Sequence, residues 1–374
     1  MVSKKNNYIL STIAWVESLA KREILKEWWK IIKVRDRMIE FTWNDEILIR
    51  VNLWSRVWNK VYKVLVKENS VDNFNKLYDL VYLSKIKKYF RNKNQFKIKV
   101  KTINSALTSI PVIQKIVTKA IINNITNNSW KRVFFDEEQE QIEVLVLIIN
   151  DKLRVLLNTT WESLHKRWYR KETWKAPIKE NLAAALVLLS WWRFKEQLYD
   201  IFCGSWTIAI EAAMIAKNIA PWLNRDFIFN SLGFINKNTY KKEKEKAKKK
   251  IYKWNYNIFA SDIDSYAIDI AKENAKEAWV ADVIEFKKLD FNYYLTKSLN
   301  WTLVSNPPYG DRLDIMDIND FYNKINNLLI KNSELKWWII TSYFLWFNKI
   351  INLKKYKRRK LYNWWEKTYF YKKR

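Results

Sequence analysis

The sequence has very little of the residues that end helices and shape tight turns. It holds 3 Gly and 5 Pro in 374 residues, whereas average usage predicts roughly 26 glycines in a chain of this length. A single Cys excludes an internal disulfide framework and argues against a structural zinc site. No stretch of about eighteen consecutive apolar residues is present, so no transmembrane helix is expected.

Tryptophan is abundant where glycine is scarce. The chain has 22 Trp and 3 Gly, and the two together come close to the number expected for glycine alone. A stop codon that is reassigned to glycine in the source organism, but translated here as Trp, would produce this pattern. The other interpretation is a protein that is truly rich in Trp. Trp28 and Trp43 favour the first interpretation, because they follow a predicted helix and occupy a predicted turn.

Positive charge dominates the composition. Lys and Arg number 68 against 39 Asp and Glu, which gives a net charge of +29. A charge of this size attracts a polyanion, of which nucleic acid is the commonest, while a membrane surface or simple solubility are the alternatives. The apolar segment Tyr8–Val16 is not followed by a cleavage site for a signal peptide. We expect a basic, multidomain, cytoplasmic protein.

The sequence patterns predict three modules, which cover residues 1–59, 60–157 and 158–374. The first reads as strand, helix, strand and helix. The second contains the strand Phe96–Thr102, in which apolar residues alternate with Lys97, Lys99 and Lys101. One face of this strand would pack, while the other presents a row of positive charge to RNA or is merely a solvated edge. From residue 176 onward strands alternate with helices, which predicts an α/β module with a parallel sheet.

The third module opens with a strand that leads directly into a helix. A short loop connects the strand Leu198–Phe202 to the helix Ile208–Ala220. Folds of this class bind adenosine-containing cofactors at such a loop. Because the ligand approaches the backbone there, position 206 requires glycine rather than an indole. The candidate cofactor-binding residues of this segment are Asp200, Phe202, Cys203, Gly204, Ser205, Trp206 and Thr207.

Acidic residues follow the next two strands. Asp262 ends the strand that begins at Asn257, where its carboxylate can accept both hydroxyls of a ribose, with Ile263 beside it. Asp290 follows the third strand and can accept from an adenine amino group, with Phe291 next to the ring. No Lys-Ser or Lys-Thr pair follows the loop, which argues against a phosphate-binding P-loop. Alone, each Asp could be a helix cap, but their order favours S-adenosylmethionine as the cofactor.

The fourth strand ends in the motif Asn306-Pro307-Pro308-Tyr309. Two consecutive prolines hold an extended, rigid backbone. The Asn306 amide oxygen and the Pro307 carbonyl can then accept from one exocyclic amine, so that the lone pair of its nitrogen points at an incoming methyl group. Tyr309 can stack on the ring that carries the amine. These four residues are the candidate catalytic residues, and a turn formed by the two prolines is the structural alternative.

The chain resembles the THUMP-containing guanine-N2 RNA methyltransferases along nearly its whole length, and above all the bacterial large-subunit rRNA enzymes with a single catalytic domain. The segments that carry the resemblance are Ser163–Arg170, Ala176–Glu180, Asp200–Ala213, Pro221–Arg225, Asn306–Gly310 and Leu361–Trp364. It implies a Rossmann-like methyltransferase domain preceded by α+β ferredoxin-like and THUMP modules. It also implies methyl transfer from S-adenosylmethionine to a guanine N2 of structured RNA. The expected RNA is 23S rRNA, with tRNA as the alternative, while the Asn-Pro-Pro-Tyr motif alone also fits methylation of adenine N6 or of protein glutamine. No metal, membrane or protein partner is expected.

The same resemblance assigns roles to residues outside these strand ends. Glu211, in the helix after the loop, joins the candidate cofactor-binding residues. A basic segment connects the THUMP module to the catalytic module and contains His165, Lys166, Arg167 and Arg170. These four are predicted to contact RNA phosphates, and the alternative is that they pack the modules together.

Family members also indicate which tryptophans stand where glycine belongs. They carry glycine at the positions of Trp168, Trp206, Trp222 and Trp364, and often an aromatic residue at Trp54, Trp192 and Trp338. If Trp206 is genuine, its indole would occupy the methionine-binding space. The chain would then be a catalytically dead RNA-binding protein.

Overall fold

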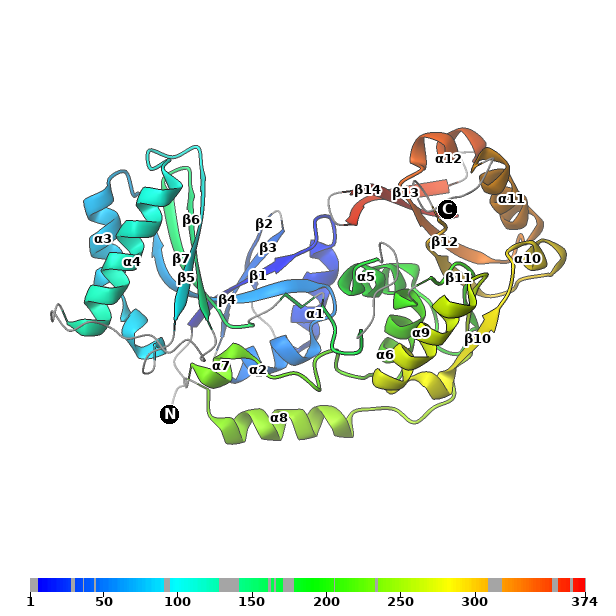
Figure 1. Ribbon diagram of the computed structural model, residues 1–374, viewed down its shortest axis with the longest axis horizontal. Coiled ribbons are helices and arrows are strands. Elements are labelled where there is room, and N and C mark those ends of the chain that lie inside the picture. Colours follow the sequence, from blue (N-terminus) through cyan, green and yellow to red (C-terminus); the bar gives the residue numbers. More distant parts are fainter. Residues whose placement is uncertain are drawn as a thin grey trace.

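The computed structural model describes residues 6–27, 31–35, 37–43, 45–90, 95–127, 141–160, 163–164, 166–170, 178–204, 206–232, 235–308, 318–351, 356–363 and 366–373. They form two seven-stranded sheets that follow one another along an elongated molecule (Figure 1). No helix in the described ranges is long and apolar enough to cross a membrane. No cluster of three or more His, Cys, Asp or Glu in those ranges could hold a metal ion.

The N-terminal sheet has the strand order β2-β3-β1-β4-β7-β6-β5. The strand bounds are β1 Asn6–Thr12, β2 Ile31–Arg35, β3 Met38–Trp43, β4 Trp58–Glu68, β5 Phe96–Ile103, β6 Ile142–Ile149 and β7 Lys152–Asn158. The long strand β4 pairs with β1 on one side and with β7 on the other. The boundary expected between residues 59 and 60 therefore falls inside β4, and the first two predicted modules share one sheet.

The C-terminal sheet has the strand order β10-β9-β8-β11-β12-β14-β13. Its bounds are β8 Leu198–Asp200, β9 Ile258–Asp262, β10 Ile284–Lys288, β11 Thr302–Ser305, β12 Lys336–Thr341, β13 Tyr356–Asn363 and β14 Glu366–Lys373. Strands β8 to β12 are parallel, and β14 inserts antiparallel between β12 and β13. The order reverses between β8 and β11, which is the point where sheets of this class bind ligands at the carboxyl ends of their strands.

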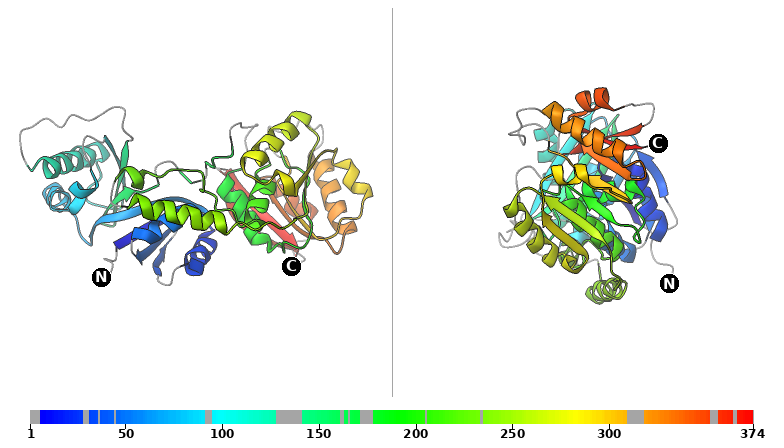
Figure 2. Two further views of the ribbon diagram at one scale, coloured as in Figure 1. Left: turned by 90° about the horizontal axis from the view of Figure 1, so that it is seen from below. Right: turned by 90° about the vertical axis from the view of Figure 1, so that its right-hand side faces the viewer.

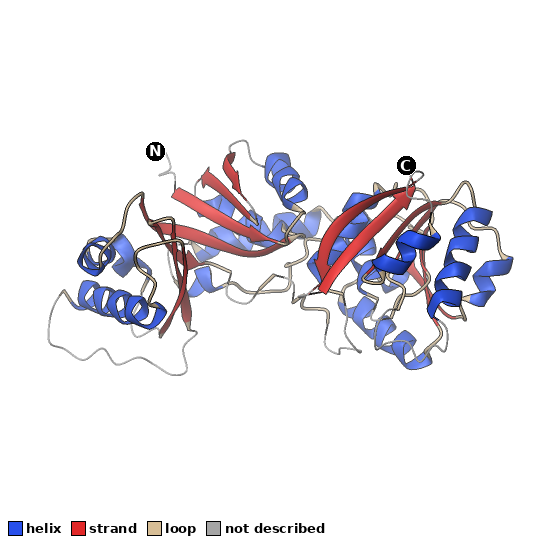
Figure 3. Ribbon diagram, turned by 90° about the horizontal axis from the view of Figure 1, so that it is seen from above, coloured by secondary structure: helices blue, strands red, loops and turns tan. Residues whose placement is uncertain are grey.

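Helices cover both faces of the C-terminal sheet (Figure 3). The helix bounds are α1 Glu17–Glu27, α2 Asp45–Trp54, α3 Phe74–Tyr82, α4 Ile110–Thr126, α5 Glu180–Ser190, α6 Thr207–Ala216, α7 Ile228–Ser231, α8 Lys237–Lys249, α9 Ser265–Glu277, α10 Asn292–Thr296, α11 Ile318–Lys331 and α12 Phe344–Ile350. Val304 and Ile340 pack with α5, α6 and α9, whereas Leu303 and Ile339 pack with α10, α11 and α12. This alternation follows from the two-residue period of a strand, and it gives a Rossmann-like α/β layer arrangement.

The two halves of the molecule share one hydrophobic core. Leu48 of α2 and Ile210 of α6 both belong to it. Helices α7 and α8 leave the C-terminal sheet and lie along the N-terminal half (Figures 1 and 2), where Arg50 of α2 donates to Glu243 of α8 at 2.9 Å. Buried contacts, rather than a linker, therefore set how the halves sit against each other.

Most elements expected in the catalytic module are confirmed. The strand–helix–strand pattern after residue 176 corresponds to β8, α6, β9 and α9, and the Lys/Glu-rich segment 241–253 lies mostly in α8. The strand expected around Phe134–Phe135 lies outside the described residues. Strand β7 and the hairpin of β13 and β14 were not expected.

Some tryptophans among the described residues have the left-handed backbone conformation that favours glycine. They are Trp15, Trp191, Trp206, Trp279 and Trp301, whose φ lies between 55° and 79°. The left-handed region costs a residue with a Cβ roughly 1–2 kcal/mol. Trp191 and Trp279 directly follow α5 and the last turn of α9, where helices commonly end in glycine. The left-handed backbone expected for Trp279 is thus confirmed, and the pattern favours replacement of glycine over a truly Trp-rich protein.

Candidate functional site

Ser305, the last residue of β11, joins the ends of β8 and β11. Its hydroxyl donates to Asp200 Oδ1 at 2.6 Å and accepts from the backbone N–H of Phe202 at 3.1 Å. Asp200 is almost completely buried, and this burial raises the pKa of its carboxyl to about 7. Ser305 therefore holds the predicted cofactor loop against the strand that leads to Asn306.

Asp262, at the end of β9, holds the other side of the loop. Its Oδ2 accepts from the backbone N–H of Gly204 at 2.8 Å, and its Oδ1 accepts from the backbone N–H of Asp264 at 3.1 Å. A Cβ placed on Gly204, whose φ is 41°, would meet nothing within 4 Å. Since the Asp262 side chain is partly exposed, each oxygen retains a lone pair for a ribose hydroxyl. Cys203 is buried beside them, and burial raises the pKa of its thiol, which stays protonated.

Aromatic rings from three elements gather beside the loop. The ring centroids of Phe202 and Phe291 lie 4.9 Å apart, and that of Phe321 on α11 lies 5.5 Å and 5.6 Å from them. Asp290 is exposed, and its carboxylate accepts a backbone N–H at the start of α10 at 2.7 Å. Ile263 is exposed as well. The residues predicted to contact adenine thus lie at the same edge of the sheet as the loop.

Trp206 occupies the last position of the loop, directly before Thr207 begins α6. Its backbone φ is 65°, and its side chain is completely buried. The indole packs on Phe286 of β10 with ring centroids 5.1 Å apart, and its Nε1 has no hydrogen-bond partner among the described residues. A left-handed backbone and an unsatisfied buried donor both cost free energy. Glycine would remove both costs, in agreement with the requirement inferred for this position.

Asn306 follows Ser305 at the carboxyl end of β11. Its Oδ1 is buried and has no donor within the described part of the chain. Tyr322 of α11 donates to the Pro308 carbonyl at 3.3 Å and forms a 2.7 Å hydrogen bond with Thr341 of β12. Tyr322 thereby holds the backbone of the motif at Pro308. The Asn306 oxygen is left as an acceptor that an amine could satisfy.

Three predicted site residues cannot be placed in this arrangement. They lie outside the described residues and are Ser205, Tyr309 and His165. Pro307 is buried directly after Asn306, so two consecutive residues of the predicted catalytic motif are held at the strand end.

One of the basic residues predicted to contact RNA is buried between the two halves instead. The guanidinium of Arg167 has no exposed surface and donates to Glu211 Oε1 at 2.9 Å and to the Arg56 carbonyl at 2.6 Å. Arg170 donates to a buried carboxylate of α5 at 2.8 Å. The buried guanidinium of Arg167 is not free to reach a phosphate, and it packs the modules together as the alternative predicts. Arg170 is half-buried and bonds within the catalytic module, and Lys166 is exposed, so RNA contact by these two residues stays a prediction.

Glu211, predicted to bind the cofactor, is also bonded to the connecting segment. Its side chain is completely buried, and Oε1 accepts from Arg167 and from the Tyr169 hydroxyl, the latter at 3.1 Å. One oxygen of the carboxylate therefore holds the connecting segment against α6, and contact of Glu211 with the cofactor stays a prediction.

The lysine row of β5 lies at the edge of the N-terminal sheet. Lys97, Lys99 and Lys101 are exposed, while Ile98 between them is buried, as the alternation predicts. Lys99 forms an ion pair with Glu143 of β6. Lys97 and Lys101 therefore carry most of the positive charge that this edge offers.

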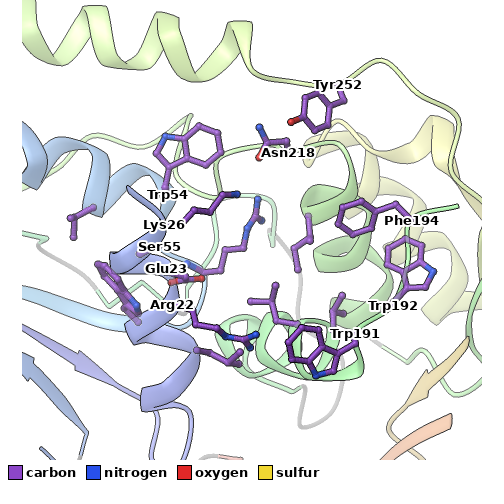
Figure 4. Close-up of a pocket in the computed structure, with 17 residues that line it drawn as sticks. Arg22, Glu23, Lys26, Trp54, Ser55, Trp191, Trp192, Phe194, Asn218 and Tyr252 are labelled. Carbon is purple, nitrogen blue, oxygen red and sulfur yellow. Dashed lines mark hydrogen bonds between the residues drawn. The ribbon is translucent and has the colours of Figure 1, made fainter. Parts of the chain in front are cut away.

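A separate cavity of about 480 Å³ lies between the N-terminal half and the opposite end of α6 (Figure 4). Arg22, Glu23 and Lys26 of α1 and Trp191 and Phe194 after α5 are among its lining residues. It is remote from the loop, because it lies beside the last turn of α6 whereas the loop precedes the first.

The edge of the sheet fits S-adenosylmethionine. Asp262 offers acceptors for the ribose, Gly204 leaves space at the backbone, and Asp290 and Phe291 flank the place expected for adenine. Ser305, Phe321 and Tyr322 also contribute to this edge but were not predicted as site residues. The position of Ser305 directly before the motif is the only one of these with a local signal in the sequence.

Comparison with known proteins agrees with this geometry. A family model described as RMKL-like, methyltransferase domain, matches residues 167–369. YpsC of Bacillus subtilis strain 168, described as a candidate RNA methyltransferase, is 33% identical over 371 residues, which cover 98% of this chain and 96% of the relative. The ribosomal RNA large subunit methyltransferase K/L of Buchnera aphidicola is 35% identical over 318 residues, 82% of this chain and 45% of the relative, so this chain spans less than half of that protein.

A solved structure with a bound cofactor product shares the fold. SMU.472, a candidate methyltransferase in complex with SAH (S-adenosylhomocysteine), has a TM-score of 0.87 and 31% sequence identity, with 99% of this chain and 98% of that chain covered. The chain therefore belongs to the RMKL-like methyltransferase domain family, and its methyl donor is S-adenosylmethionine.

Proposed function

We propose that the protein methylates the exocyclic N2 of a guanine in 23S rRNA. The observation that carries this proposal is the buried Oδ1 of Asn306, which has no partner among the described residues and is adjacent to the serine that ties β11 to the cofactor loop. Any N–H or O–H group can satisfy such an acceptor, and the exocyclic amine of a base offers an N–H for it. The relatives described as an RNA methyltransferase and as a large-subunit rRNA methyltransferase support RNA as the substrate.

Positioning of the amine accounts for most of the chemistry. The oxygens of Asn306 and Pro307 accept the two N–H groups, so that the nitrogen lone pair faces the methyl carbon. S-adenosylmethionine supplies this electrophilic carbon, and S-adenosylhomocysteine is the second product once a nitrogen–carbon bond has replaced the sulfur–carbon bond. The methylated amine then loses one proton to water, so that no side chain has to act as a base. The target base must leave its stack to reach this edge.

The N-terminal half is proposed to hold the RNA. In this proposal residues 1–59 form a ferredoxin-like module and residues 60–157 form a THUMP module within the shared sheet. The net charge of +29 and the exposed Lys97 and Lys101 on the β5 edge support contact with a phosphate backbone. Recognition would then depend on RNA shape, with a steep dependence on salt.

A methyl-transfer assay with three acceptors tests the substrate. Unmodified 23S rRNA, a tRNA transcript and a glutamine-containing peptide are incubated with methyl-labelled S-adenosylmethionine, and digested RNA is examined for N2-methylguanosine by mass spectrometry. The proposal expects this nucleoside from 23S rRNA. The same product from tRNA alone would select the tRNA enzyme instead. Methylated adenine or glutamine would reject guanine as the acceptor.

A second candidate is an RNA-binding protein without activity. The observation that favours it is the fully buried indole of Trp206 at the end of the cofactor loop. The affinities of this chain and of its Trp206→Gly variant for S-adenosylmethionine separate the two candidates.

A further inference from the structure

Three arginines from the N-terminal half and the connecting segment donate hydrogen bonds to α6 and to the residue that follows it. Arg170 Nη2 donates to the hydroxyl of Thr207, the first residue of the helix, at 2.7 Å. Arg167 Nε donates to Glu211 in the second turn at 2.9 Å. Arg56 Nη2 donates to the carbonyl of Ile219, beyond the last turn, at 2.8 Å. We refer to Arg56, Arg167 and Arg170 as the arginine clamp.

The clamp is a connected unit rather than three separate contacts. Arg167 Nη2 donates to the backbone carbonyl of Arg56 at 2.6 Å, and its Nη1 donates to the Leu164 carbonyl at 2.8 Å. Tyr169 donates to the same Glu211 oxygen as Arg167. Arg167 and Glu211 have no exposed side-chain surface. A buried, charge-assisted pair with this many fixed partners allows one geometry of the helix.

The helix gripped by the clamp begins where the cofactor loop ends. The loop is attached to the sheet by the bonds of Gly204 to Asp262 and of Phe202 to Ser305. Its other end continues into α6 through Trp206, whose carbonyl accepts the helical N–H of Ile210 at 3.0 Å. A shift of α6 would therefore move the loop backbone relative to Asp262. Arg56 and Arg167 bond to α6 beyond its first turn, so their effect on the cofactor is indirect, whereas Arg170 holds Thr207 directly after the loop.

We propose that the arginine clamp positions α6, and with it the loop Asp200–Trp206, in the geometry that binds S-adenosylmethionine. The N-terminal half is then part of the cofactor site through Arg56, although it contributes no contact to the cofactor. This inference depends only on S-adenosylmethionine as the methyl donor and not on which RNA is methylated.

Conservative variants test the clamp without leaving a buried carboxylate unpaired. Arg167→Lys keeps a positive charge beside Glu211 but loses the hydrogen bonds to the carbonyls of Leu164 and Arg56. Arg170→Lys keeps a positive charge beside the Glu180 carboxylate of α5 but loses the hydrogen bond to Thr207. Arg50→Lys is the matched control, because Arg50 joins the N-terminal half to Glu243 of α8 without touching α6. Each variant is made in the printed chain and again with Trp206→Gly, so that a block by the indole cannot conceal the result.

Two readouts are compared under conditions where every variant is folded. Calorimetry should show that Arg167→Lys and Arg170→Lys weaken S-adenosylmethionine binding by about fivefold or more, which corresponds to a coupling of about 1 kcal/mol. Hydrogen exchange of backbone amides should quicken in the peptide that spans the loop and the first turn of α6, and not in α9 or α11. RNA affinity should stay within about twofold, whereas general destabilisation would lower both affinities.

The proposal is overturned if both clamp variants bind S-adenosylmethionine within twofold of the parent and leave exchange in the loop unchanged. It is also overturned if Arg50→Lys reproduces their effect, because the contact would then act through the general packing of the halves. Neither readout requires methyl transfer. A failure of the proposed rRNA activity would therefore leave this test intact.

Discussion

Asn306 is the residue whose loss should separate chemistry from cofactor binding. Asn306→Ala removes an acceptor for the amine but no group that faces Asp262, so we expect kcat to fall by about 10²-fold or more while the affinity for S-adenosylmethionine stays unchanged. Single-turnover methylation of 23S rRNA measures the first quantity and calorimetry the second. Asn300→Ala, at an exposed position before β11, is the control. An unchanged single-turnover rate would remove Asn306 from the catalytic residues.

The residue at position 206 should determine how well the protein binds its cofactor. The residue combines a φ of 65° with a buried indole that has no partner for its Nε1 among the described residues. Trp206→Gly restores the backbone freedom that the loop requires and should tighten binding of S-adenosylmethionine by about tenfold or more. Calorimetry on the two chains measures the change. Equal affinities would show that the indole does not obstruct the cofactor.

The sequence predicts individual site residues when their chemistry and their place at a strand end coincide. Asp262 and Asn306 were predicted in this way, because parallel strands bring their carboxyl ends to one edge. The buried ion pair of Arg167 and Glu211 was not predicted, since a charged residue carries no local sign of burial and the two lie 44 positions apart. Tyr322 was missed for the same reason: its contact with Pro308 exists only after α11 has packed on the sheet.

At the scale of the element, the end of α5 tests the hypothesis that Trp stands at positions where the source organism has glycine. Trp191 has a φ of 55° and is mostly exposed, whereas its neighbour Trp192 is buried and donates to the Glu196 carbonyl at 2.9 Å. Trp191→Gly should stabilise the protein by about 1 kcal/mol, and Trp192→Gly should destabilise it by about 3 kcal/mol or more. Chemical denaturation of both variants measures these changes. Destabilisation by Trp191→Gly would contradict the hypothesis for that position.

The exposed lysines of strand β5 test the proposed contact with the RNA backbone. Lys97→Gln and Lys101→Gln each remove one exposed charge from the edge without touching the buried face. Each should weaken RNA binding at low salt and reduce the slope of log affinity against log salt by about 1. Lys152→Gln, at the exposed first position of β7, is the control, and filter binding at several salt concentrations is the measurement. Unchanged slopes would place the RNA elsewhere.

Elements were predictable where a local pattern sets them. Apolar runs followed by helical periodicity indicated β8, α6, β9 and α9, and alternation indicated β5. The insertion of β14 between β12 and β13 was not predictable, because strand pairing over this distance is decided by packing and not by a local repeat. The module boundary at residue 59 fell inside β4 for a related reason: one long strand serves the pairings on both sides.

At the scale of the whole molecule, the shared core makes the two halves one cooperative unit. The connecting segment between them is basic in sequence, but Arg167 joins the halves through Glu211 and the Arg56 carbonyl, and Arg170 bonds to α5 and α6. The positive charge available to RNA therefore comes from the outer edge of the N-terminal sheet and from surface lysines. In the proposed function the N-terminal half would hold the RNA backbone, while the target amine and the cofactor would meet at the edge of the C-terminal sheet.

The contact between the halves should also make stability depend on pH. Glu23 of α1 lies between the halves (Figure 4), and burial, opposed by Arg56 and Arg167, raises the pKa of its carboxyl to about 7 from an ordinary value of 4.5. Between these two values the folded protein binds more protons than the unfolded chain, so its free energy of unfolding falls as pH rises. Below pH 4.5 the contribution is fully present, and above pH 7 it is lost.

Glu23→Gln removes this titration and should flatten the fall in stability between pH 5 and pH 8 by on the order of 1–2 kcal/mol. The slope that remains is expected from Asp200, whose pKa burial also raises to about 7. Glu273→Gln, which changes a carboxylate exposed on α9, is the control and should leave the profile of the parent intact. Urea denaturation at each pH measures the free energy of unfolding. A Glu23→Gln profile as steep as that of the parent would show that this carboxylate ionises freely, and that the contact between the halves is open to water at α1.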